Sequence, residues 1–323
     1  MRYAALLGIP IKSKISGGMS HNGVIPKKRT YMFEGTFTAI ITPFDKTGVD
    51  YVSFEKLIES QIEGGINGLV FIGTTGEPAT MTGEEKKTLR DFAIKKVRSR
   101  VPVIFGTGSN CTRTAVENSI AAKSEGADGI LVVTPYYNKC TQDGLRLHYE
   151  AIADKCDLPM IIYNVPGRTG VNILPQTAGK LARDIPTIVG IKEACGNLEQ
   201  IAKTAEEIKG TQLQLMSGDD KLAVDIARLG GTTLISVASN ALPSEYTKVM
   251  ALAGEKKFDE AQALLDKYAK LNDLFFCEVN PIPIKYACSL LGLCRNELRL
   301  PLTPISEANA SLLKEEMRRL NII

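Results

Sequence analysis

One lysine of the sequence stands where a charged side chain is costly. Lys192 ends the apolar, β-branched run "TIVGIK" and is followed by Glu193. An unshifted lysine has a pKa near ~10.4, so only about one amine in a few thousand is neutral at pH 7. Burial lowers that pKa, and a neutral amine attacks a carbonyl to form a Schiff base. The alternative is a lysine that reaches solvent or pairs with Glu193, and the strand alone does not decide between them.

Three further segments carry side chains suited to the same chemistry. "GTTGE" contains Thr74 and Thr75, whose hydroxyls and backbone N–H groups can hold a small carboxylate. Tyr163 ends "MIIY", and its phenol can carry protons. Arg168 in "VPGRTG" offers a bidentate fork for a second carboxylate. Each has an ordinary structural explanation, namely a turn, a core tyrosine and a surface ion pair, but together they indicate a site for an anionic keto acid.

Eight apolar runs predict the strands that position these residues. They are continuous rather than alternating, as in parallel strands covered on both faces. The runs are 37–44, 68–77, 101–110, 129–138, 159–170, 187–197, 212–220 and 233–240. Helix-like segments lie between them, and one opens with the capping-box pair Thr82 and Glu85. The count and spacing predict an α/β fold, a (β/α)8 TIM barrel, whose strands deliver their C-terminal residues to one face.

A doubly wound open sheet is the alternative architecture. It would place a glycine fingerprint after the first strand, where this chain has "TPFDKTG". We therefore expect a catalytic barrel over 33–240 and a C-terminal helical extension over 241–323.

Residues 1–32 form an N-terminal extension that is either a transit peptide or a disordered segment without a targeting role. The second interpretation is favoured, because Met32 leads directly into the first strand.

Composition excludes several classes of function. Residues 1–33 hold six basic and no acidic side chains, and the remainder holds 33 basic against 36 acidic, which argues against nucleic-acid binding. No apolar run is long enough to span a membrane. The seven cysteines form no CxxC pair and only two histidines are present, which disfavours a zinc site or a disulfide framework. Reduced thiols fit a cytoplasmic protein.

Four motifs give the chain a resemblance to a known family. "GTTGEPATM", "TPYYNK", "YNVPGRTG" and "GIKEACGN" resemble the dihydrodipicolinate synthase family, within the pyruvate-dependent class I aldolase superfamily of (β/α)8 barrels. The similarity runs from about residue 33 to the C-terminus. It implies condensation of pyruvate with L-aspartate 4-semialdehyde to 4-hydroxy-tetrahydrodipicolinate, the first committed step of diaminopimelate and lysine biosynthesis. It implies no metal or organic cofactor, and a homotetramer built from tight dimers.

The resemblance also implies roles for individual residues. Lys192 forms the imine with pyruvate, and Tyr163 donates and accepts protons. Thr74 and Tyr137 complete a proton relay with Tyr163, and Tyr137 is supplied by a neighbouring subunit. Substrate binding is implied for three further residues: Thr75 for the pyruvate carboxylate, the backbone of Ile235 for closing the same pocket, and Arg168 for the carboxylate of the aldehyde.

The sequence departs from the family pattern at a few positions. Cys140 stands where relatives often have proline, which should alter a loop but not the chemistry. Asn110 and Tyr136 match the family's lysine-inhibition site, but four positions lack its polar, histidine or glutamate side chains: Pro78, Gly83, Lys86 and Thr114. We therefore expect weak or absent inhibition by lysine, which initial rates with millimolar lysine would test.

Two other functions stay open at this point. One is a pyruvate-dependent aldolase or lyase acting on a sugar acid, which would release pyruvate by retro-aldol cleavage and lose little when Arg168 is replaced. The other is a catalytically silent, metabolite-binding regulator, which would form no covalent adduct with pyruvate. The presence of Lys192, Tyr163 and both threonines argues against the regulator.

Overall fold

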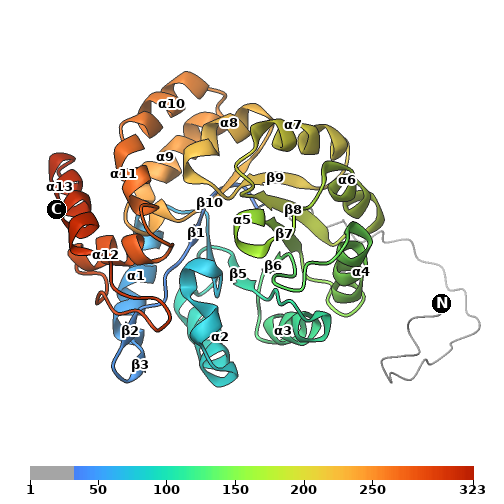
Figure 1. Ribbon diagram of the computed structural model, residues 1–323, viewed down its shortest axis with the longest axis horizontal. Coiled ribbons are helices and arrows are strands. Elements are labelled where there is room, and N and C mark those ends of the chain that lie inside the picture. The colour runs from blue at the N-terminus through green and yellow to red at the C-terminus, as the bar shows by residue number, and fades with distance from the viewer. Residues whose placement is uncertain (1–32) are drawn as a thin grey trace, which may run out of the picture. The chain divides into compact units, whose positions relative to one another are not determined.

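The computed structural model describes residues 33–323, and the predicted extension over 1–32 lies outside the described residues. Eight parallel strands close into a barrel in the order β1-β10-β9-β8-β7-β6-β5-β4 (Figure 1). They are β1 (Gly35–Ala39), β4 (Gly68–Phe71), β5 (Val103–Gly106), β6 (Gly129–Val133), β7 (Met160–Asn164), β8 (Ile188–Glu193), β9 (Gln214–Ser217) and β10 (Thr233–Ser236). The predicted TIM barrel is confirmed, and the open sheet is excluded because β1 pairs with β10.

The strands are shorter than the apolar runs that predicted them. In most runs the strand occupies the first half, and the rest forms the loop at its carboxyl end. A two-stranded antiparallel sheet of β2 (Phe44–Asp45) and β3 (Gly48–Val49) follows the first barrel strand. The loops that carry "TTGE", "YYN" and "GDD" therefore open at one face of the barrel, where β/α barrels build their sites.

Two apolar cores explain why the strands are apolar on both faces. Inside the barrel, Phe37, Ile104, Ile161 and Met216 pack with other buried side chains. A larger core lies between the strands and the surrounding helices. All five residues of β7 and all six of β8 are buried, so Lys192 near the end of β8 is enclosed as the sequence led us to expect.

The helices that alternate with the strands cover the outside of the barrel. They are α1 (Tyr51–Glu63), α2 (Gly83–Val97), α3 (Thr112–Ser124), α4 (Gln142–Ala153), α6 (Pro175–Asp184), α7 (Leu198–Glu207), α8 (Ala223–Arg228) and α9 (Pro243–Gly254). The capping box predicted for Thr82 and Glu85 is present at the start of α2. α9 packs on the barrel, since the Thr36 hydroxyl in β1 donates to the Tyr246 carbonyl at 2.9 Å.

Four more helices follow α9. They are α10 (Phe258–Asp266), α11 (Ala269–Phe275), α12 (Ile282–Leu290) and α13 (Glu307–Arg319). α13 packs against α11 and α12 (Figure 1). The division of the chain at residue 240 remains a prediction. Within residues 33–323, no helix combines the length and apolar character needed to cross a membrane.

Candidate active site

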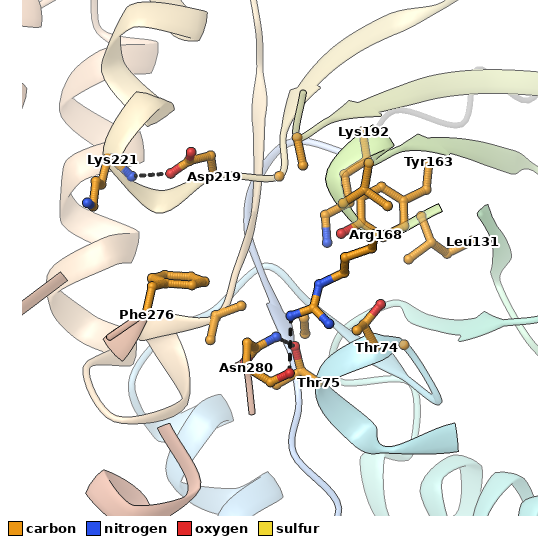
Figure 2. Close-up of a pocket in the computed structure, with 16 residues that line it drawn as sticks. Thr74, Thr75, Leu131, Tyr163, Arg168, Lys192, Asp219, Lys221, Phe276 and Asn280 are labelled. Atoms are coloured by element: carbon orange, nitrogen blue, oxygen red, sulfur yellow. Dashed lines mark hydrogen bonds between the residues drawn. The ribbon is translucent and has the colours of Figure 1, made fainter. Parts of the chain in front are cut away.

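A cavity of about 310 Å³ opens at the carboxyl ends of the barrel strands. Five of the seven predicted site residues line it: Thr74, Thr75, Tyr163, Arg168 and Lys192. They come from three segments far apart in the sequence, the loop after β4, the β7 end with its short helix α5 (Pro166–Thr169), and β8. Figure 2 shows these side chains converging on the cavity.

Lys192 and Tyr163 are paired neighbours on adjacent strands. The register of β7 and β8 places them side by side, and the Lys192 Nζ lies 4.3 Å from the centroid of the Tyr163 ring. Both are buried, with 5% and 7% of their surfaces exposed. A lysine at this position meets an aromatic face and little water.

This environment makes the amine reactive near neutral pH. Burial lowers the pKa of Lys192 to about 8; the nearby Asp220 carboxylate opposes this shift and the Arg168 guanidinium adds to it. A pKa of about 8 leaves roughly a tenth of the amine neutral at pH 7, against about one in a few thousand for an unshifted lysine. The neutral, nucleophilic fraction of the amine at pH 7 is therefore a few hundred times larger than in an unshifted lysine.

Tyr163 is held in its protonated form. Burial raises the pKa of its phenol to about 12, and the Arg168 cation and the Thr74 hydroxyl reduce that rise. A phenol with this pKa is fully protonated at neutral pH but is a weaker acid than a free tyrosine, so it gives up its proton only to a strong base. To accept one it needs neighbours that stabilise the phenolate, and Arg168 and Thr74 are the groups in place.

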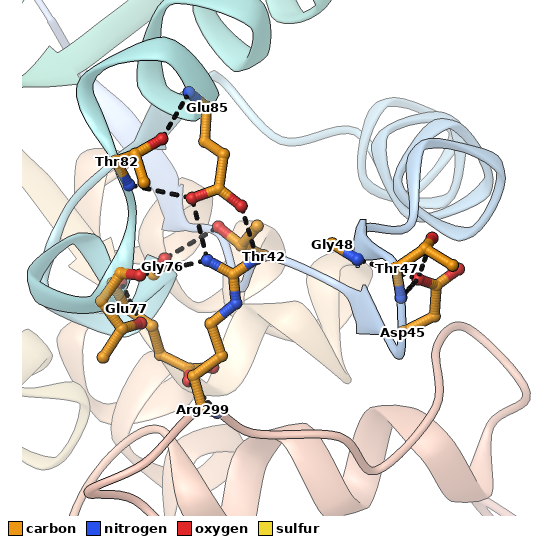
Figure 3. Close-up of polar contacts among 10 residues, drawn as sticks. Thr42, Asp45, Thr47, Gly48, Gly76, Glu77, Thr82, Glu85 and Arg299 are labelled. Atoms are coloured by element: carbon orange, nitrogen blue, oxygen red, sulfur yellow. Dashed lines mark hydrogen bonds and ion pairs between the residues drawn. The ribbon is translucent and has the colours of Figure 1, made fainter.

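A short 3-10 helix, η2 (Thr74–Gly76), presents both threonines to the cavity. It is fixed from two sides. The Thr42 hydroxyl donates to the Gly76 carbonyl at 2.8 Å, and Glu77, which follows in the left-handed conformation with φ 55°, forms a buried ion pair with Lys285 of α12. Figure 3 shows Thr42, Gly76 and Glu77 at this turn.

Arg168 and Thr75 are both held by Asn280, which lies between α11 and α12. The Nη2 of Arg168 donates to the Asn280 backbone carbonyl at 3.2 Å, and the Asn280 Nδ2 donates to the Thr75 hydroxyl at 3.0 Å (Figure 2). Four of the five guanidinium N–H groups stay available to an anion. The cavity therefore offers a hydroxyl and a cation as two separate receptors for carboxylates.

The other two predicted residues do not line this cavity in the described chain. Ile235 is fully buried in β10, inside the barrel core. Tyr137 lies in the loop after β6 with φ 73° and with 90% of its surface exposed. Tyr137 is therefore not part of this cavity within its own chain.

Several residues that line the cavity are not among the seven predicted site residues. Phe276 and Asn280 come from the segment between α11 and α12, and Asp219 and Lys221 follow β9. The segment over 241–323 was interpreted as helical, so its side chains were assigned no place in the site. The "NPIP" stretch was the available signal, because an Asn-Pro pair marks a loop and not a helix interior.

A buried acid, Asp220, organises the loop after β10. Its carboxylate accepts hydrogen bonds from the Ser236 hydroxyl and from the Val237 and Ala238 amides, the latter two at 3.0 and 3.2 Å. Burial raises its pKa to about 6, and these hydrogen bonds reduce that rise.

Across residues 33–323, no group of three His, Cys, Asp or Glu side chains is placed to hold a metal ion.

Fold and cavity together define an enzyme of the (β/α)8 class, with its polar groups at the carboxyl ends of the strands. The chain belongs to the dihydrodipicolinate synthetase family, whose sequence profile matches residues 32–320. The family resemblance of the four motifs is thereby confirmed.

Individual relatives agree with this assignment. The 4-hydroxy-tetrahydrodipicolinate synthase of Alkaliphilus oremlandii is 48% identical over 292 residues, covering 90% of this chain and 100% of that protein. The crystal structure of dihydrodipicolinate synthase from Thermotoga maritima is 40% identical with a TM-score of 0.89, covering 91% of this chain and 100% of that one. The synthase from Acinetobacter baumannii, solved in complex with pyruvate, is 44% identical with a TM-score of 0.88, covering 90% and 100%.

Proposed function

We propose that the protein condenses pyruvate with L-aspartate 4-semialdehyde to give 4-hydroxy-tetrahydrodipicolinate, the first committed step of diaminopimelate and lysine biosynthesis. The observation that carries this proposal is the buried Lys192 amine, in contact with Tyr163 and in one cavity with both a hydroxyl pair and an arginine. A keto acid, an imine-forming amine and a second carboxylate are the partners that these groups suit.

The reaction begins with the first substrate. Thr75 binds the pyruvate carboxylate, and the neutral Lys192 amine attacks the keto carbon. Loss of water gives a protonated imine, which is the electron sink, so the reaction needs no metal or organic cofactor. Tyr163, supported by Thr74, shuttles the protons of these steps, and loss of a methyl proton converts the imine to an enamine.

The second substrate enters at Arg168. The guanidinium binds the carboxylate of the aldehyde, and the enamine carbon attacks the aldehyde carbon, whose oxygen takes a proton and becomes the hydroxyl group. The amine of the second substrate then attacks the imine carbon and displaces Lys192. One water leaves overall, and the lysine is free for the next turnover.

Replacement of Arg168 separates this proposal from a sugar-acid lyase. Arg168→Ala should raise the KM for aspartate semialdehyde at least about tenfold, while the half-saturating pyruvate concentration for imine formation changes little. Steady-state rates with each substrate varied in turn measure the split. An unchanged KM for the aldehyde, or release of pyruvate from a sugar acid, would contradict the proposed second substrate.

Assembly and location are part of the same proposal. A homotetramer of tight dimers would bring the exposed Tyr137 of one subunit to the cavity of another. A cytoplasmic location fits the seven free cysteines, because thiols stay reduced in that compartment.

A further inference from the structure

Asn280 joins the two side chains that we propose as carboxylate receptors. It lies between α11 and α12, lines the cavity and has 7% of its surface exposed. Its side-chain Nδ2 donates to the Thr75 hydroxyl at 3.0 Å, and its backbone carbonyl accepts from Arg168 at 3.2 Å. One residue of the C-terminal part of the chain thus contacts both receptors (Figure 2).

The bond to Thr75 determines which way that hydroxyl can donate. A threonine hydroxyl has one hydrogen and two lone pairs, whereas an amide nitrogen only donates. Since the Asn280 Nδ2 occupies the acceptor side of Thr75 Oγ1, the hydroxyl hydrogen points elsewhere. Among residues 33–323, no acceptor takes that hydrogen, so it is available to a carboxylate in the cavity.

The bond to Arg168 restrains the orientation of the guanidinium. A planar fork binds a carboxylate through two parallel hydrogen bonds only when its orientation is set. Anchoring one Nη2 hydrogen on the Asn280 carbonyl removes rotations that would point the fork away from the cavity. The remaining N–H groups keep the geometry for a bidentate contact.

We propose that Asn280 is a positioning residue, whose side chain orients the Thr75 hydroxyl toward the first carboxylate and whose backbone carbonyl holds the Arg168 guanidinium for the second. This inference rests on the proposed function, because the carboxylates are those of pyruvate and of the aldehyde. Asn280 acts through its neighbours, so the effect of its loss on pyruvate binding should depend on the presence of Thr75.

The test measures how much pyruvate is needed to form the borohydride-trapped adduct at Lys192. Asn280→Ala should raise the half-saturating pyruvate concentration by about five- to tenfold, the loss of one oriented hydrogen bond. In a Thr75→Val background the same replacement should add less than about twofold. Asn280→Asp keeps the side-chain shape but replaces the donor by an acceptor. The carboxylate would accept the Thr75 hydrogen and repel the substrate carboxylate, so the half-saturating pyruvate concentration should rise further than in Asn280→Ala.

A matched control is Asn272→Ala, which removes another buried asparagine of the same region. Asn272 lies in α11, accepts from the Tyr246 hydroxyl and does not line the described cavity, so the half-saturating pyruvate concentration should stay within about twofold. Asn280→Asp also serves if Asn280→Ala fails to fold.

The possible failures are distinguishable. The role of Asn280 alone is overturned if Asn280→Ala leaves the half-saturating pyruvate concentration unchanged. It is also overturned if Asn280→Ala raises that concentration by the same factor in the Thr75→Val background. No adduct in the unaltered protein would overturn the proposed function and this inference with it.

Discussion

At the scale of single residues, the protonation of Lys192 decides how fast the site can react. Its pKa of about 8 predicts that imine formation at subsaturating pyruvate follows the neutral amine, rising about tenfold between pH 7 and pH 9 and levelling above that. Rapid-quench trapping with borohydride across pH measures this profile. A rate that still rises tenfold from pH 9 to pH 10 would mean that the amine is not shifted.

Gly218 keeps the space that the lysine side chain occupies. A Cβ at this position would lie 2.8 Å from Cε and 2.9 Å from Cγ of Lys192. Gly218→Ala should therefore displace the amine. Because overpacking costs about 1–3 kcal/mol, kcat should fall by about ten- to a hundredfold. Steady-state kinetics test this against Gly254→Ala, where an added Cβ meets no described atom within 4 Å. Equal kcat values for both variants would contradict the role of Gly218.

At the scale of elements, the C-terminal helices support the turn that carries Thr74 and Thr75. The Lys285 ammonium of α12 is fully buried against Glu77 and lies 4.4 Å from the centre of the Phe44 ring. Nearby, the Arg299 Nη1 donates to the Thr80 carbonyl at 3.1 Å and to Glu85 at 3.0 Å, and Figure 3 shows Arg299 reaching Glu85. Residues far along the chain thus anchor the segment after β4.

Breaking this buried pair should cost stability. Lys285→Met leaves the buried Glu77 carboxylate without its counter-ion, with the Arg299 amide still donating to it at 3.3 Å, and should lower the free energy of unfolding by about 3–5 kcal/mol. Urea unfolding measures it, and the double variant with Glu77→Gln should recover most of the loss. Lys203→Ala, which breaks an exposed pair with Glu199, should cost less than about 1 kcal/mol. A similar cost for both single variants would contradict the anchoring role.

The barrel could be predicted because its signals are local. Each strand is an apolar run buried on both faces, and the closed order follows from eight such runs at regular spacing. The same reasoning brought Lys192, Tyr163, Arg168 and the two threonines to one face, since all follow carboxyl ends of strands. What is set by strand order can be inferred from sequence.

The rest of the cavity depends on tertiary contacts that no local pattern encodes. Asn280 reaches Thr75, 205 positions earlier in the chain, and Lys285 reaches Glu77 at a separation of 208. Only the path of α11 and α12 over the barrel brings these groups together. Ile235 was predicted by resemblance for its backbone; in the described chain its side chain is enclosed in the core, and the residue is not among those that line the active-site cavity.

In the assembled protein, the role proposed for Tyr137 predicts that subunits share active sites. Mixing Tyr137→Phe subunits with Lys192→Ala subunits forms dimers in which one cavity has an intact lysine and an intact partner tyrosine. If Tyr137 acts across an isologous interface, the mixture should regain up to about a quarter of full activity. Steady-state assays after subunit exchange measure the recovery. Mixtures no more active than the sum of the two variants would exclude this role.

The proposed reaction requires that the buried Lys192 amine, whose neutral fraction at pH 7 is far larger than that of an unshifted lysine, condenses with a keto acid. Treating the protein with pyruvate and borohydride, and then mapping peptides by mass, tests it most directly. We expect a single reduced adduct on Lys192, absent from Lys192→Ala and formed without any added metal or cofactor. An unmodified Lys192 in protein that remains folded would contradict it.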